Sequence, residues 1–460
     1  MKKTFNSLKT LISAKITSIT LILLVCVFAA YTIFLSFNLQ AGIIPDETYR
    51  FTVSRSFINT WGIPDNVSIL ESSGESLHRG SFLGYWIYGR TLAAFQLFAP
   101  TATEWQMLVF LRLVNAIFSW GTVIFTFLLA KEILRNKWHQ ILPPFMLTNT
   151  LMFVFLSGGV NYDNPTILFC TISLFFLVRT FKNESFIENS LGWVITISIA
   201  TLIKYSVLPM AFIMTVVYVV FIIKNKPSFT FAKLKGYKGI FLAAAFLVLL
   251  FLNFNTYGIN LIRFRSIYPS CFDVYSVEIC DASSYVVRHR NMALPEKLSI
   301  PEAFRQGNPE PIRYIFGAWN RAMADRIFGI MGHKIYFPIS VAYFMILIYW
   351  SIGLGLRYIN KPNFLIASLL GIFLFYALVL VRMNYNSQLV YGFDTSVALQ
   401  GRYLFPVITI AYVLWGYILE KVTNQWVRWG TIAALVLLFL YGGPIRFIWY
   451  YNSVFADWFI

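Results

Sequence analysis

The run ITSITLILLVCVFAAYTIFLSF, residues 16–37, contains no charged residue and is followed closely by IIPDETYR, residues 43–50. An apolar run of this length can span the roughly 30 Å hydrocarbon core of a bilayer as a helix. It is too long for the core of a signal peptide, and no convincing small-residue cleavage site closes it, so we interpret it as a retained first span. Two adjacent carboxylates, Asp46 and Glu47, therefore lie just beyond a membrane helix.

The remainder of the chain has the composition of a membrane protein. Of its 460 residues, 58% are hydrophobic and only 12% are charged, and these proportions exclude an ordinary soluble domain. We predict an all-α polytopic membrane protein with about eleven transmembrane helices. The apolar runs place these helices at 17–37, 107–130, 141–159, 164–180, 190–205, 207–223, 239–258, 335–356, 363–382, 402–419 and 428–448.

Segment 81–100 is ambiguous because it is moderately apolar but carries Arg90. If this segment does not cross the membrane, every basic short connection falls on the side of the N-terminus, including the five lysines of 224–238. The positive-inside rule therefore favours a segment 81–100 that lies in the outer surface or re-enters it. We expect a multi-pass protein of the bacterial inner (cytoplasmic) membrane, with its N-terminus inside and its C-terminus outside.

This topology divides the chain into three parts. Residues 1–258 form a transmembrane core whose first outer loop, 38–106, carries the two adjacent acids. Residues 259–334 form a second outer region, and residues 335–460 form the C-terminal transmembrane helices. The first outer loop is the natural place to look for chemistry, because it places carboxylates at the bilayer surface.

An interfacial helix is predicted at 47–61. Tyr49, Val53, Phe57 and Trp61 recur every fourth position there, which places them on one face of a helix. Arg50 and Arg55 lie off that face. We expect the aromatic face to contact the membrane surface.

Two of the four cysteines, Cys26 and Cys170, lie inside expected spans. The other two, Cys271 and Cys280, share the second outer region. They could form a disulfide if that region faces an oxidising compartment.

The net charge of +17 does not indicate nucleic acid binding. Lysines and arginines lie in short connections between apolar runs, where they orient the chain and contact lipid headgroups. No basic stripe with interleaved aromatic residues lies outside the spans. We expect membrane lipids as partners and no nucleic acid. His, Cys and Asp residues lack the spacing of a metal cage, so we expect no cofactor, while any metal requirement of the reaction stays open.

Polar residues gather near the expected outer ends of the spans: Asp46, Glu47, Asp163, Lys204 and Arg402. Asp46 and Glu47 follow Pro45, so they could simply complement the dipole of a helix that begins there. Alternatively, one of them is a general base that takes a proton from an acceptor hydroxyl. Neighbouring residues of a helix face different ways, so at most one should be the base, and we prefer Asp46.

Two interpretations are also open for each of the other polar residues, Asp163, Lys204 and Arg402. Asp163 could assist a helix cap formed by Asn164 and Pro165, or it could orient an acceptor or a sugar hydroxyl. Lys204 and Arg402 could extend to the lipid headgroups from the ends of their spans. Alternatively, they bind a lipid-linked phosphate, for which the planar fork of arginine is well suited.

Five short motifs resemble integral-membrane glycosyltransferases of the GT-C type, the superfamily of protein mannosyltransferases and aminoarabinose transferases. They are Pro45-Asp46-Glu47 after the first span, RLVN at 112–115, NYDN at 161–164 with Lys204-Tyr205, and QGRYLFP at 400–406.

The resemblance implies a single displacement, with inversion, from a polyprenyl-phosphate-linked sugar to a glycan, lipid or protein acceptor at the outer face. Asp46 or Glu47 would be the base and Asp163 a second outer acid. Lys204, Arg402 and Tyr403 would hold the donor phosphate, and further substrate-binding candidates are His78, Arg79 and Tyr205.

The sequence also departs from the family pattern. The His-Pro-Pro often found in the first outer loop is His78-Arg79-Gly80 here, which leaves the role of His78 open. Neither Asp-x-Asp nor Trp-Trp-Asp occurs, which argues against an oligosaccharyltransferase and against an obligatory metal. A transporter or flippase of a lipid-linked saccharide is an alternative, but transporters tend to place charges near the membrane midplane and to contain repeats. A polymerase or ligase of surface polysaccharide is the other alternative.

Overall fold

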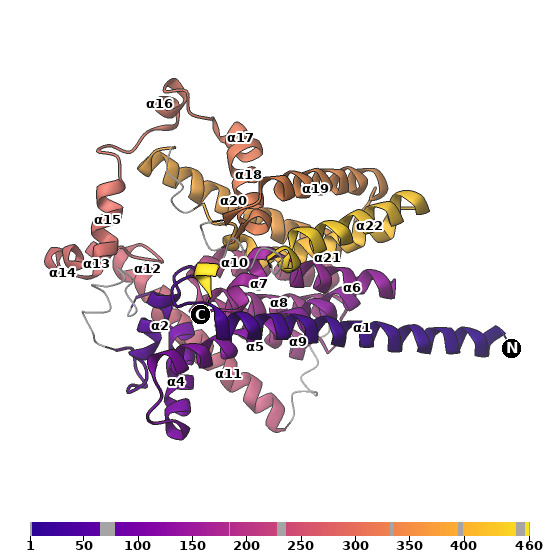
Figure 1. Cartoon of the computed structure of the whole chain (residues 1–460), viewed down its shortest axis with the longest axis horizontal. Helices are drawn as coiled ribbons and strands as arrows, with labels where there is room; N and C mark the ends of the chain where they lie inside the picture. The colour runs from indigo at the N-terminus through magenta and orange to yellow at the C-terminus, as the bar shows by residue number, and fades with distance from the viewer. Residues whose placement is uncertain are drawn as a thin grey trace.

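The computed structural model describes residues 2–64, 79–183, 185–227, 236–331, 335–393, 399–447 and 456–459. Almost all regular structure in these ranges is helical, which confirms the predicted all-α membrane fold. The strands among them are one short antiparallel pair, β1 (Ile330–Met331) and β2 (Ile335–Tyr336). Figure 1 shows the long helices gathered into one bundle, with the N-terminal end of the first helix projecting from it.

Ten helical segments of the described chain are long and apolar enough to cross a membrane, or eleven if one bent pair counts as a span. This agrees with the predicted number. The segments are formed by α1 (Lys2–Asn38), α5 (Glu104–Ile133), α8 (Asp163–Phe181), α9 (Phe186–Ile203), α10 (Leu208–Asn225), α11 (Tyr237–Asn253), α19 (Pro338–Tyr358), α20 (Phe364–Tyr391), α21 (Phe405–Lys421) and α22 (Gln425–Gly442).

The bent pair corrects the straight span predicted at 141–159. Its two helices, α6 (Lys137–Thr148) and α7 (Leu151–Ser157), meet at 65°. The break follows from the residues between them. The side chains of Asn149 and Thr150 donate to the carbonyls of Phe145 and Met146, at 2.9 and 2.8 Å. Side chains that bond to the helix backbone in this way compete with helix continuation.

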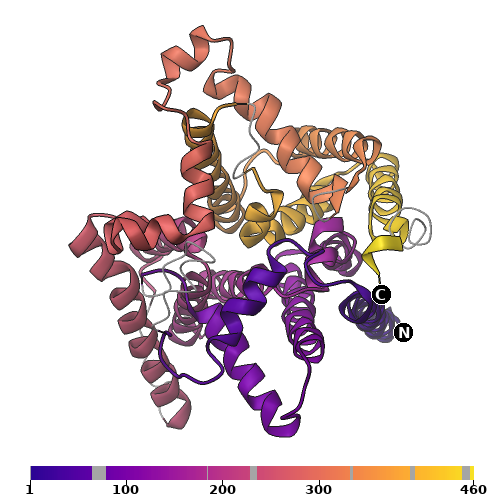
Figure 2. The ribbon, with the colours of Figure 1, turned by 60° about the vertical axis from the view of Figure 1, so that its left-hand side comes forward.

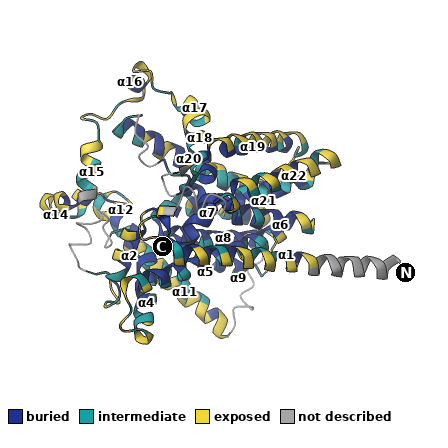
Figure 3. Ribbon diagram, viewed as in Figure 1, coloured by how far each residue is buried: buried dark blue, intermediate teal, exposed yellow. Residues whose placement is uncertain are grey.

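The bundle is densest around α5, α8, α9 and α21, and every residue of the short α7 is buried. In Figure 3 the buried residues concentrate in this central group, whereas α1, α11, α19 and α22 expose much of their length. Large exposed apolar side chains on these outer helices suit contact with lipid. Leu39, just beyond α1, forms an isolated bridge with Phe459, near the 3₁₀ turn η7 (Ala456–Trp458).

Within the described residues of the first outer loop, 38–64 and 79–106, lie the helices α2 (Glu47–Arg55) and α4 (Leu83–Phe98). The predicted helix 47–61 is therefore too long. Val53 and Phe57 are fully buried against Tyr85 of α4, whereas Trp61 is 76% exposed. The apolar face thus packs on α4 instead of on the membrane surface. A Cβ atom at Gly89 would come within 2.3 Å of the Phe57 Cβ, so glycine permits this close packing.

The second outer region is a series of short helices. Its residues 271–305 stand away from the bundle (Figures 1 and 2), whereas its end packs on α7 and α19. In this region, Cys271 and Cys280 are joined by a disulfide. The α-helices are α12 (Ile259–Phe264), α13 (Cys271–Val274), α14 (Val277–Ala282), α15 (Ser284–Met292), α16 (Ile300–Arg305), α17 (Pro311–Tyr314) and α18 (Asn320–Ala324). Three π-helical turns, η3 (Phe254–Gly258), η4 (Ile315–Trp319) and η5 (Asp325–Gly329), adjoin them, and two 3₁₀ turns, η1 (Tyr205–Val207) and η6 (Gly401–Leu404), precede α10 and α21.

The charge distribution predicts the sidedness of this fold. In a C26S/C170S background, a cysteine at Gln306 should react with a membrane-impermeant maleimide in intact cells, because the predicted topology places the second outer region outside. A cysteine at Tyr237, which is 94% exposed, should react only after permeabilisation, because the lysine-rich connection 224–238 stays inside. Labelling of the residue 237 cysteine in intact cells would overturn the topology.

Candidate active site

A buried ion pair between Glu47 and Arg112 lies beneath the first outer loop. Arg112 Nε donates to Glu47 Oε1 at 2.8 Å and Arg112 Nη2 to Glu47 Oε2 at 2.6 Å, and both side chains are completely buried. Glu47 also accepts from the backbone amides of Val160, at 3.0 Å, and Gly42, at 3.3 Å. Both carboxylate oxygens are therefore occupied.

Arg112 uses its remaining donors on the end of the first span. Nη1 donates to the carbonyls of Ser36 and Leu39, and Nη2 donates to that of Gln40, at 2.6 to 3.1 Å. Carbonyls at the C-terminal end of a helix have no partner within the helix, so these bonds cap α1. The pair joins α1, α2 and α5 at one point. The motif RLVN contributed to the family resemblance, but the sequence did not indicate that its arginine pairs with Glu47.

Asp46 is partly exposed to solvent, in contrast to the fully buried Glu47. Its backbone adopts a left-handed conformation, with φ of 61°, so its side chain is not part of the α2 surface. The side chain is 43% exposed, and its Oδ2 lies 2.5 Å from Arg402 Nη2. Aspartate tolerates this conformation better than most residues. Of the two adjacent acids, Asp46 is the one that a substrate can reach.

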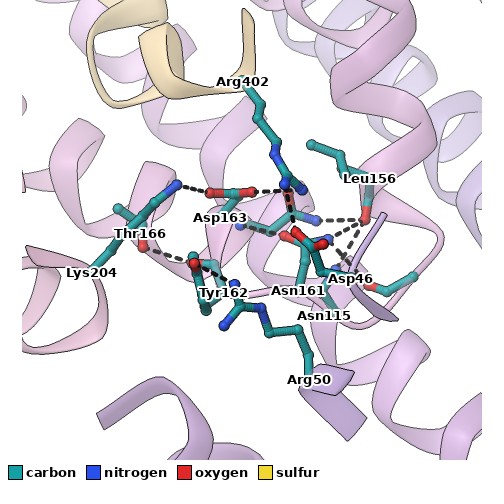
Figure 4. Close-up of polar contacts among 12 residues, drawn as sticks. Asp46, Arg50, Asn115, Leu156, Asn161, Tyr162, Asp163, Thr166, Lys204 and Arg402 are labelled. Atoms are coloured by element: carbon teal, nitrogen blue, oxygen red, sulfur yellow. Dashed lines mark hydrogen bonds and ion pairs between the residues drawn. The ribbon is translucent and has the colours of Figure 1, made fainter. Parts of the chain in front are cut away.

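Arg402 connects Asp46 to a second carboxylate, that of Asp163. Arg402 Nη1 lies 3.8 Å from Asp163 Oδ2, while the other oxygen of Asp163 accepts from Lys204 Nζ. Figure 4 shows the Arg402 guanidinium between Asp46 and Asp163, with Lys204 approaching Asp163 from the opposite side. Asp163, Lys204 and Arg402 are all buried. Lys204 and Arg402 therefore do not extend to the headgroups, which corrects that interpretation.

Aromatic rings surround the cations of this cluster. Lys204 Nζ lies 5.1 Å from the centre of the Tyr162 ring and 4.8 Å from that of Tyr403. Arg50 packs on the other part of the site, with its Cζ 3.7 Å from the Tyr162 ring centre and its guanidinium donating to the Tyr162 hydroxyl. Cation–π contacts of this kind stabilise desolvated cations. Arg50 was not among the predicted site residues, because its spacing indicated only that it lies off an apolar helix face.

A set of amides fixes the turn that carries Asp163. The side chains of Asn115, Asn161 and Asn164 all donate to the carbonyl of Leu156, at 2.7 to 3.2 Å. The backbone amide of Asn164 donates to Asn161 Oδ1 at 3.1 Å. We expected Asn164 to cap α8, but the helix already begins at Asp163. The side chain of Asn161 instead accepts from the backbone amide of Asn164 at the start of the helix.

Other predicted residues lie apart from this cluster. Tyr205 stacks on Tyr268 at 4.2 Å between ring centres, and Arg79 Cζ lies 5.9 Å from the ring centre of Phe264. His78 lies outside the described residues. In the part of the chain that the structure describes, no group of three or more His, Cys, Asp or Glu side chains could hold a metal ion.

Comparison with known families matches one segment of the chain. Residues 97–266 match the model of the dolichyl-phosphate-mannose-protein mannosyltransferases. Over this segment the chain is similar to glycosyltransferases of the GT-C type. The predicted resemblance is thereby confirmed. The matched segment includes Arg112, Asp163 and Lys204, whereas Asp46 and Arg402 lie outside it.

Solved structures give a weaker likeness. The archaeal oligosaccharyltransferase AglB from Archaeoglobus fulgidus is 13% identical with a TM-score of 0.49, over 94% of this chain and 58% of that one. The arabinosyltransferase EmbB from Mycobacterium smegmatis is 10% identical with a TM-score of 0.44, over 87% of this chain and 30% of that one. The chain thus spans little more than half the length of AglB. A comparison with curated proteins finds no match.

The buried pair predicts a strong effect on stability. Glu47→Gln and Arg112→Gln should each destabilise the protein by about 3–5 kcal/mol, because each leaves one buried charge uncompensated. The double variant should lose less than the sum of the two, as determined from unfolding in lipid nanodiscs. Asp281→Asn and Arg290→Gln remove an exposed pair and should change stability by less than about 1 kcal/mol. Additive losses at Glu47 and Arg112 would contradict the coupling.

Proposed function

We propose that this protein transfers a sugar from a polyprenyl-phosphate donor to an acceptor hydroxyl at the outer face of the membrane, with Asp46 as general base. In this reaction the acceptor oxygen attacks the anomeric carbon while the bond from that carbon to the phosphate oxygen breaks. The acceptor proton passes to the Asp46 carboxylate, and the lipid phosphate leaves with the bonding electron pair. The displacement inverts the anomeric carbon.

The contrast between the two adjacent acids carries the assignment of Asp46. A general base must lie within hydrogen-bond reach of the proton that it takes. Both oxygens of Glu47 are occupied by Arg112 and two backbone amides in a fully buried site. Asp46 is partly exposed, and its carboxylate contacts Arg402 at the open part of the cluster. Glu47 is therefore a positioning residue, and Asp46 is the carboxylate available to an acceptor.

The charge of the cluster suits a phosphate. Three cations, Arg50, Lys204 and Arg402, surround two carboxylates, Asp46 and Asp163, so the group has a net charge of +1 if all are ionised. The phosphate of a lipid-linked sugar would be attracted by this excess and could take an arm of Arg402 from Asp46. That exchange would release the carboxylate for proton transfer while the cation stabilises the leaving group.

Asp163 is better suited to positioning than to contact with a substrate. Its side chain is 5% exposed and its two oxygens face Lys204 and Arg402. It would hold both cations at the phosphate position, with Tyr403 covering Lys204 from the other side. This differs from the expectation that Asp163 orients an acceptor or sugar hydroxyl.

Orientation and family support the outer face and the lipid-linked donor. The basic connections on the side of the N-terminus support an outer position for the ends of α1, α8, α9 and α21 that carry the cluster. The family matched at 97–266 is described by a dolichyl-phosphate-mannose donor, which is the same class of lipid-phosphate sugar. The acceptor would be a glycan, lipid or protein at that surface of the bacterial inner membrane.

Substitution of the base tests the proposal. Asp46→Asn should lower the rate of transfer from a labelled polyprenyl-phosphate sugar by about 10²–10⁴-fold, because the amide cannot accept the proton. Asp281→Asn, the same change at an exposed ion pair of the second outer region, should retain the rate. A flippase needs no base, so unchanged transfer or transport by the Asp46 variant would refute the proposal.

The phosphate role of Arg402 predicts a separate effect. Arg402→Lys keeps the positive charge but removes the planar fork that reaches Asp46 and Asp163 together. Its KM for the donor should rise at least about tenfold, the equivalent of about 1.4 kcal/mol of binding. Initial rates at varied donor concentration would measure this. An unchanged KM would show that Arg402 does not contact the donor.

A further inference from the structure

The turn η5 packs directly against the turn η6, which carries Arg402 and Tyr403. A Cβ atom at Gly401 would come within 2.8 Å of the carbonyl carbon of Arg326 and 2.9 Å of the Met323 oxygen. Glycine at position 401 therefore lets the two backbones touch. This packing places Arg326 next to the active-site turn, although it lies 76 residues earlier in the sequence.

One polar group of η5 and one of α17, close enough to influence each other electrostatically, have no hydrogen-bond partner among the described residues. They are Arg326 Nη1 and the hydroxyl of Tyr314, and both atoms are buried. The Tyr314 ring is held by Tyr385 and Phe393, at 5.1 and 6.3 Å between ring centres, so aromatic contacts fix the ring without satisfying its hydroxyl.

The neighbouring carboxylate is engaged elsewhere. Asp325 Oδ1 accepts from the Tyr336 hydroxyl at 2.8 Å, and Oδ2 lies 3.9 Å from Arg321 Nε. Burial lowers the pKa of Arg326, and the opposing effects of Asp325, Tyr314 and Tyr403 do not cancel it. Arg402 and Lys204, in contrast, each face a carboxylate. Arg326 is thus a half-buried cation whose buried Nη1 has no acceptor among the described residues.

The chemistry of Arg326 and Tyr314 indicates which hydrogen-bond acceptor they would bind. A guanidinium only donates hydrogen bonds, and a tyrosine hydroxyl beside a cation donates most favourably to an anion. A buried donor without an acceptor costs about 1–3 kcal/mol, and more when it is charged. An oxyanion would satisfy both donors and neutralise Arg326.

We infer that Arg326 and Tyr314 bind an oxyanion of the substrate, at a position separate from that of the phosphate held by Lys204 and Arg402. That the oxyanion belongs to a substrate rests on the proposed function. It would be either the second phosphoryl group of a diphosphate-linked donor or the carboxylate of an acidic sugar. The substrate would then carry two anionic groups. A donor with a neutral sugar on a single phosphate carries only one.

Binding of two probes tests the inference. Isothermal titration of the full chain in lipid nanodiscs would measure the affinities for inorganic pyrophosphate and for glucuronate. The wild-type protein should bind at least one of them. The affinity for that probe should fall at least about tenfold in Arg326→Gln, the loss of one charge-assisted hydrogen bond, and recover in part in Arg326→Lys. The affected probe identifies the source of the oxyanion.

Two further variants make the test decisive. Tyr314→Phe removes a hydroxyl that has no partner, so it should keep the unfolding midpoint but weaken binding of the same probe several-fold. Arg321→Gln is the matched control, since Arg321 precedes Arg326 by five residues but its side chain is 70% exposed. The inference is wrong if neither probe binds, or if Arg326→Gln and Tyr314→Phe bind like Arg321→Gln. Because neither probe is transferred, this result is independent of the outcome for Asp46.

Discussion

The Glu47–Arg112 pair is the interaction on which the outer half of the structure depends. Two opposite charges are removed from water there, and such a pair is stable only when every remaining donor and acceptor finds a partner. The chain meets this requirement with carbonyls from the end of α1 and amides from the turns at Gly42 and Val160. Satisfying one ion pair thereby fixes where the first span ends, where α2 begins and how the turn before α8 lies.

The same constraint separates the functions of two neighbouring acids. Glu47 is directed inward as the first residue of α2, and the left-handed backbone at Asp46 turns the preceding side chain away from it. One carboxylate is consequently rigid and fully bonded, while the next is partly exposed and adjoins a cation. The amide cluster on Leu156 and the stacked cations around Tyr162 complete this arrangement by fixing Asp163 and Lys204 behind the exposed acid.

The sequence predicted the features that depend on local composition. Long apolar runs predicted the helices, because hydrophobic length is enough to identify a span. The charge bias of the connections put the acidic and basic residues at the helix ends on one side of the membrane, which indicated a shared cluster. It did not predict long-range partners. Glu47 meets Arg112, and Gly401 brings Arg326 to Arg402, through packing that no spacing encodes. The side-chain bonds at Asn149 and Thr150 broke a run that hydropathy alone extends, and the face expected to meet lipid is buried on α4 because Gly89 admits Phe57.

The contact between Asp46 and Arg402 joins residues that are 356 positions apart. Arg402 enters the membrane with α21, after every other charged member of the cluster has been synthesised. During biosynthesis Asp46 can therefore pair with Arg402 only after the late helices have docked on the early ones. The site is completed only when α21 joins the early helices, so the proposed sugar transfer would require the late part of the chain to be in place.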